Sequence, residues 1–167
     1  MLSRGTGPRP FPEIGEIAMM LRGLFSAVLM VAVVATAAVA ADEVGQVKVS
    51  KGEVHIERDG KSLPAPVGVK VQLRDVVVTG ADGSAGVTFL DNSLMSVGPG
   101  SALAIDRFVF DSTTNQGTFE SSLKRGTLSV VSGKIAKQAP DAMKVKTPAA
   151  ILGVRGTEFV VRTGEKD

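Results

Sequence analysis

The segment "LRDVVVTGADGSAGVTFLDNSLMSVGPGS", Leu73 to Ser101, decides the fold. It reads as three short strands separated by turns at Asp82-Gly83 and Asp91-Asn92, followed by a break at Gly98-Pro99-Gly100. Apolar residues alternate with small or polar ones from Ala85 to Phe89, as in a strand with one buried face. The segment therefore predicts a β-sheet made of short strands.

The same pattern continues on both sides of this segment. Val54 and Ile56 fall on one face of a predicted strand, and Asp59-Gly60 then predicts a hairpin turn. In "ALAIDRFVF", residues 102–110, the alternation slips, which indicates a β-bulge. After residue 40, helical character is confined to one weak turn within residues 135–142, so the sequence predicts an all-β domain.

A weak internal repeat suggests how the strands are arranged. "KGEVHI" (Lys51–Ile56), "RGTLSV" (Arg125–Val130) and "RGTEFV" (Arg155–Val160) each place a glycine directly before a strand. Glycine permits backbone angles that other residues resist, so each unit is expected to begin with a corner or bulge. Stacked β-corners predict an irregular β-solenoid or roll of short strands. A two-sheet β-sandwich is the alternative.

The first 40 residues differ from the rest. Arg22 precedes an uncharged apolar run from Leu24 to Ala40 that ends in Ala38-Val39-Ala40. This is the layout of a helical signal peptide over residues 19–40, cleaved before Ala41 or Asp42. An uncleaved membrane anchor is the alternative, although a spanning helix needs about 20 strongly apolar residues.

This reading divides the chain into three parts. Residues 1–18 form a non-structural N-terminal extension, with Met1, Met19 or Met20 as the true start, and residues 41–167 form the β domain. The protein is expected in the periplasm or secreted, and on a membrane only through an uncleaved leader.

The amino-acid composition narrows the classes of function that the protein can have. The chain has no Cys, Trp or Tyr, one His and a net charge of +2. It therefore has no disulfide or thiolate metal site, and nothing calls for a nucleic-acid partner. His55 lies on the polar face of its predicted strand, and no nucleophile or phosphate-loop pattern is complete. We expect no catalytic, cofactor-binding or metal-binding residue, and no enzymatic activity.

One segment near the C-terminus carries a specific resemblance. "TPAAILGVRGTEFVV", Thr147 to Val161, with Thr147-Pro148, Gly153 and the run through Arg155, Gly156, Thr157 and Phe159, resembles the signature of FecR-type domains. Earlier segments, including "LRDVVVTG" and "LKRGTLSVVSGKIAK", are similar to the same family in the same order.

The resemblance implies a β-rich module outside the cytoplasm. The best-known members are transducers whose periplasmic part senses an outer-membrane receptor and whose cytoplasmic part controls a sigma factor. Sigma-factor control is not carried over to this chain, because only a short segment precedes the apolar run. The expected function is a non-enzymatic periplasmic module that binds protein partners in envelope signalling; the alternative is a structural or assembly scaffold of the envelope.

Arg155 is expected to have a structural role. Gly153 and Gly156 flank it, which would let the strand turn a corner while the arginine side chain leaves the core. A buried guanidinium needs a carboxylate, and Asp75 and Asp91 are the candidates. Contact with a ligand or partner and an ordinary exposed arginine are the alternatives.

A partner surface is expected beside the signature. Val160, Val161 and Arg162 follow the signature strand and are expected to border an unpaired sheet edge. Such an edge can accept a strand from a partner peptide. The alternative is that these residues already pair with an interior strand.

Overall fold

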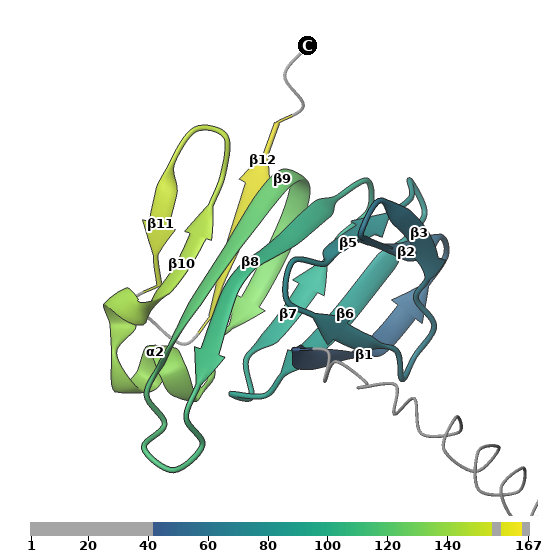
Figure 1. Ribbon diagram of the computed structural model, residues 1–167. Helices are drawn as coiled ribbons and strands as arrows, with labels where there is room; N and C mark the ends of the chain where they lie inside the picture. Colours follow the sequence, from purple (N-terminus) through teal and green to yellow (C-terminus); the bar gives the residue numbers. More distant parts are fainter. Residues whose placement is uncertain (1–41, 155–157, 165–167) are drawn as a thin grey trace, which may run out of the picture. The chain divides into compact units, whose positions relative to one another are not determined.

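The computed structural model describes residues 42–154 and 158–164, which fold into a curled, open and mostly antiparallel sheet (Figure 1). The all-β prediction is confirmed. The first strands are β1 (Glu43–Lys51), β2 (Val54–Arg58), β3 (Lys61–Pro64), β4 (Lys70–Gln72), β5 (Val76–Thr79), β6 (Ser84–Phe89), β7 (Leu94–Val97), β8 (Ala102–Phe110) and β9 (Gly117–Val131).

Most of these strands are halves of longer, bent strands. The pairs β1–β2, β5–β6 and β7–β8 each run through a short corner, and β9 passes the same corner without a break. One half of the curled sheet has the order β3-β2-β5-β8-β9, and the other has the order β4-β1-β6-β7-β9. This arrangement of stacked corners is the roll that the sequence predicted.

Glycines occupy the corners because the backbone there is left-handed or crowded. Gly52 has a φ of +62° and Gly126 a φ of +89°. A Cβ at Gly126 would lie 2.0 Å from Ser101 Oγ, on the neighbouring bent strand. The repeated glycines of "KGEVHI" and "RGTLSV" are therefore corner residues. The third unit begins at Arg155-Gly156, outside the described residues.

The tight turns follow the predicted chemistry. Asp59 and Gly60 both have positive φ, at 50° and 74°, and join β2 to β3. Asn92, with a φ of 65°, joins β6 to β7. The predicted bulge in β8 is present as a register shift between Ile105 and Arg107, with Asp106 as the extra residue.

The core lies between the two halves of the sheet. Phe89 comes from one half, and Phe108 and Phe119 come from the other. The ring centroid of Phe119 is 4.6 Å from that of Phe89 and 5.0 Å from that of Phe108. Phe110 and Phe159 are partly buried against this cluster. Phenylalanines from both halves of the sheet therefore fill the centre of the core.

The C-terminal segments follow β9, and all of them except β11 pack against it. They are α2 (Lys134–Gln138), the 3-10 turn η1 (Pro140–Ala142), β10 (Met143–Lys146), β11 (Ile151–Gly153) and β12 (Glu158–Thr163). Ile135 of α2 and Met143 of β10 are buried. None of the helices in the described part of the chain is long and apolar enough to span a membrane. The predicted leader lies outside the described residues.

Candidate functional site

The signature segment begins with a tight hairpin turn. The backbone N–H of Thr147 donates to the carbonyl of Ala150 at 2.8 Å, and the N–H of Ala150 donates to Thr147 Oγ1 at 3.0 Å. Pro148 lies inside this turn, where its missing N–H leaves no hydrogen bond unmade. Thr147 and Pro148 therefore fix the reversal between β10 and β11.

Both strands of the signature lie at sheet edges. Within the described residues, β11 pairs only with β10, and β12 pairs only with β9. β10 runs parallel to residues 119–122 of β9, and β12 runs antiparallel to residues 126–131 of the same strand. The signature thus supplies the outermost strand of each half of the curled sheet.

The two faces of β12 differ in character. Val161 is buried and Phe159 packs against the core. Glu158, Val160 and Arg162 point to the outer face, where Val160 is 66 % exposed. The Nε of Arg162 donates to Thr127 Oγ1 at 3.2 Å, which holds the guanidinium on that face. An open edge thus carries an exposed valine between an acid and a base.

The remaining signature residues divide into two groups. A Cβ at Gly153 would meet nothing within 4 Å, and Val154, next along the chain, is buried with its N–H bonded to the carbonyl of Met143 at 3.1 Å. Arg155, Gly156 and Thr157 lie outside the described residues. The expected ion pair of Arg155 therefore stays a prediction.

Asp75, a candidate partner of Arg155, binds another arginine. Its side chain is fully buried and receives Nε and Nη2 of Arg58, each at 2.7 Å. The N–H of Gln72 donates to the same carboxylate at 2.7 Å. The hydrogen bond to Asp75 raises the pKa of Arg58. This two-point ion pair ties β2 to the turn before β5.

Asp91, the other candidate, belongs to a buried turn network. Its carboxylate accepts the N–H of Ser93 at 3.0 Å and the Oγ of Ser93 at 2.7 Å. The N–H of Gly133 donates to Ser93 Oγ at 3.0 Å, and the N–H of Lys134 donates to the carbonyl of Asp91 at 2.7 Å. The network joins the turn between β6 and β7 to the start of α2.

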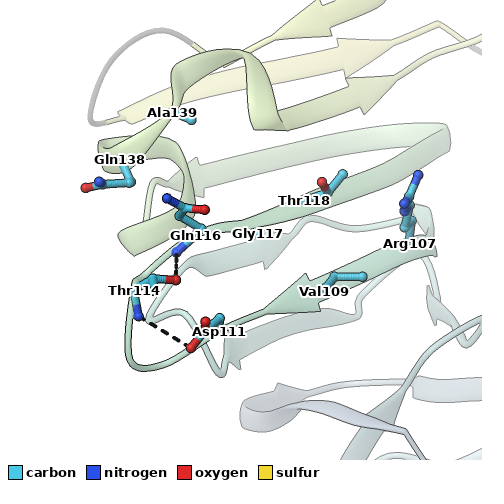
Figure 2. A pocket seen from close by; sticks show the side chains of 9 residues that line it. All are labelled: Arg107, Val109, Asp111, Thr114, Gln116, Gly117, Thr118, Gln138 and Ala139. Atoms are coloured by element: carbon cyan, nitrogen blue, oxygen red, sulfur yellow. Dashed lines mark hydrogen bonds between the residues drawn. The ribbon is translucent and has the colours of Figure 1, made fainter.

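A cleft of about 530 Å³ opens beside the hairpin between β8 and β9 (Figure 2). Its lining mixes polar side chains with the apolar Val109 and Ala139, and Asp111 is its carboxylate. Asp111 Oδ1 accepts the backbone N–H groups of Thr113 at 2.8 Å and Thr114 at 3.4 Å. These bonds lower the pKa of Asp111. An ionised carboxylate that stabilises its own turn is poorly suited to act as a general acid.

The neighbouring sheet half carries a half-buried ion pair between β9 and β10. Lys146 Nζ of β10 lies 2.7 Å from Glu120 Oε2 of β9. Hydrogen bonding between them lowers the pKa of Glu120 and raises that of Lys146. The pair reinforces the parallel contact between β9 and β10, and the two shifts keep both groups ionised near neutral pH.

The fold and the signature edge define an all-β module with an open strand, and sequence comparison identifies its family. Residues 75–167 match the family model described as FecR protein. The chain therefore belongs to the FecR family. The match starts at the buried Asp75 and includes the whole signature segment. No curated protein and no solved structure matches the chain.

Proposed function

We propose that this protein is a non-enzymatic, exported FecR-family module that binds a protein partner in the cell envelope. The partner contributes an extended segment, which adds to the sheet along β12. Among the described residues β12 pairs on one side only, with β9, and this open edge is the observation that carries the proposal.

The edge suits strand addition for two reasons. Its outward backbone N–H and C=O groups have no strand partner within the described residues, so an extended peptide can satisfy them. Val160, 66 % exposed in the middle of the strand, offers an apolar contact to a side chain of the incoming segment. Backbone bonds would supply affinity, and this side-chain contact would supply selectivity.

The surroundings of several ionisable groups support the part of this proposal that makes the module non-enzymatic. Asp75, Asp91, Asp111 and Glu120 are held in turns or ion pairs. His55 lies on β2, within the regular antiparallel pairing of β2 with β5. Across residues 42–154 and 158–164, no cluster of His, Asp and Glu could hold a metal ion.

The location in the envelope rests on the leader sequence. Arg22, the uncharged run from Leu24 and the Ala38-Val39-Ala40 ending are typical of an exported chain. Envelope signalling, for which the family is known, is the context we propose for the partner.

Photo-crosslinking in living cells tests this function. A crosslinking residue at position 160 should give adducts between this chain and a different protein. The same residue at position 109, which is 55 % exposed on β8, is the matched control and should give none. Equal adducts from both positions, or no foreign adduct from position 160, would contradict the proposal.

Two proline variants then locate the contact on the backbone. Successive N–H groups of a strand point to opposite sides, so Val160→Pro and Val161→Pro remove N–H groups with opposite directions. One variant should weaken pairing with β9 and lower the melting temperature. The other should fold normally and lose the foreign adduct, with the crosslinker then placed at position 162. If both variants unfold, β12 is an interior strand and strand addition is wrong.

A further inference from the structure

We propose that β12 also pairs with β12 of a second copy of this chain. The two strands run antiparallel about a two-fold axis at Val160, so that one half of the curled sheet continues across a homodimer. This inference shares the open edge with the proposed function but requires no foreign partner.

The sequence of β12 is complementary to itself in this arrangement. Pairing about residue 160 places Glu158 opposite Arg162 of the partner subunit, and Val160 opposite Val160 of the partner subunit. All three side chains point to the outer face and are exposed. The two-fold axis repeats the Glu–Arg pair, so the contact has two ion pairs around one apolar pair.

Phe159 and Val161 form the corresponding pairs on the inner face. Val161 is 7 % exposed, and Phe159 is partly buried against the core. Opposed residues on one sheet face have Cβ atoms about 4.5–5.5 Å apart. Pairing would therefore cover the part of Phe159 that the single chain leaves accessible.

The charges select this register over its neighbours. A shift of two residues in either direction places a charged residue opposite the apolar Val160. A shift of four places Glu158 opposite itself or Arg162 opposite itself, and like charges directly opposed destabilise a strand pair. A shift of one turns the outer face of one strand against the inner face of the other.

The other edges of the described sheet are less suited to such pairing. β3 has four residues, begins with Lys61 and ends with Pro64, which are residues that block edge pairing. β4 and β11 have three residues each. β12 has six, without lysine or proline. The side chain of Glu158 is exposed, and none of the salt bridges within the described chain involves it.

The contact between the two β12 strands is small, so we expect a weak dimer. A stable interface buries about 800 Å² per partner, more than one six-residue edge supplies. The dimer should therefore form reversibly with rising protein concentration. Because ion pairs on an exposed face are screened by salt, it should weaken at high ionic strength.

Charge reversal tests the inference by sedimentation of the purified exported protein alone, at low salt. Glu158→Arg and Arg162→Glu each place like charges opposite one another and should raise the dissociation constant roughly tenfold. The double variant recreates both ion pairs in reverse order and should restore the dimer. Glu57→Arg, exposed on β2, is the control and should leave it unchanged. Thermal melts check that every variant folds.

A cysteine scan gives an independent readout, since the chain contains no cysteine. A single cysteine at position 160 lies on the proposed axis and should join two copies through a short thiol-reactive crosslinker. Cysteine at position 109 should not. A protein that stays monomeric at all concentrations would overturn the inference. A dimer that is insensitive to the single charge reversals would also overturn the inference. A double variant that fails to restore the dimer would do the same. These results do not involve foreign adducts, so this inference and the proposed function can fail separately.

Discussion

At the scale of single residues, the pair of Asp75 and Arg58 shows how a buried charge is retained in this fold. The carboxylate is fully buried, whereas the side chain of Arg58 is 24 % exposed. Arg58 also donates from Nη2 to the carbonyl of Lys70 at 2.9 Å, so one guanidinium links β2, β4 and the turn before β5. Asp75 is also the first residue of the family match.

Arg58→Ala should lower the free energy of unfolding by about 3 kcal/mol, because Asp75 would remain buried without its cation. Chemical denaturation of the variant and the wild type measures this difference. Glu57→Gln, one residue away and exposed, is the control and should stay within about 0.5 kcal/mol of the wild type. A variant at position 58 as stable as the control would show that the ion pair contributes nothing to stability.

The sequence indicates part of this residue-scale picture. Asp75 and Asp91 stand out as acids at the ends of predicted strands, and the structure gives both a role at strand–turn junctions. The partner of Asp75 could not be predicted. Arg58 sits 17 positions earlier in the chain, and only the pairing of β2 with β5 brings the two together. Arg155 lies outside the described residues, so its ion pair stays a prediction.

At the scale of elements, the corners decide the course of the chain. Each bent strand crosses from one half of the sheet to the other, and its corner packs against the corner of the next. At one such contact, the N–H of Thr127 donates to Ser101 Oγ at 2.9 Å. Thr79 Oγ1 donates to the carbonyl of Gly98 at 2.6 Å and accepts the N–H of Ser101 at 3.0 Å. Small and hydroxyl-bearing residues therefore stack where the sheet curls.

Two glycines allow two requirements for glycine at a corner to be measured separately: the left-handed backbone and the lack of space for a Cβ. Gly100 and Gly126 both have positive φ, but only Gly126 is crowded, because a Cβ there would lie 2.6 Å from Ser101 Cα. Gly100→Ala should cost about 1–2 kcal/mol from the left-handed backbone alone. Gly126→Ala should cost clearly more, because the neighbouring backbone must also shift. Equal melting temperatures for the two variants would contradict the corner packing.

Turns and strand faces could be predicted at this scale because both depend on local chemistry. The Asp59-Gly60 turn, the bulge near Asp106 and the alternation from Ala85 to Phe89 are all present. The β10–β11 hairpin and the parallel pairing of β10 with β9 could not be predicted. Pairing between distant strands depends on the whole sheet, which no short window of sequence contains.

At the scale of the whole molecule, the proposed function requires an exported protein. The intact mass of the protein recovered from the envelope should correspond to a chain that begins at Ala41 or Asp42. This follows from the charge at Arg22 and the small residues at Ala38 and Ala40. A full-length species retained in the inner membrane would instead support the anchor alternative.

The expectation of a sheet edge at Val160 to Arg162 comes from the position of these residues in the chain. The structure places them in β12, with β9 as their partner. The order of Glu158, Val160 and Arg162 is complementary to itself, but a pairing can be inferred from it only once these side chains are known to share the outer face. Charge order along a strand is visible in the sequence, but the face to which it belongs depends on the sheet.

Amide hydrogen exchange along β12, followed by NMR in dilute protein, tests the open edge most directly. Every second N–H from Glu158 to Thr163 should exchange slowly, because it donates to β9, and the N–H groups between them should exchange fast. At high protein concentration the fast set should gain protection. Protection of all these N–H groups in dilute protein would mean that another segment already covers the edge, and it would contradict both strand addition and the proposed dimer.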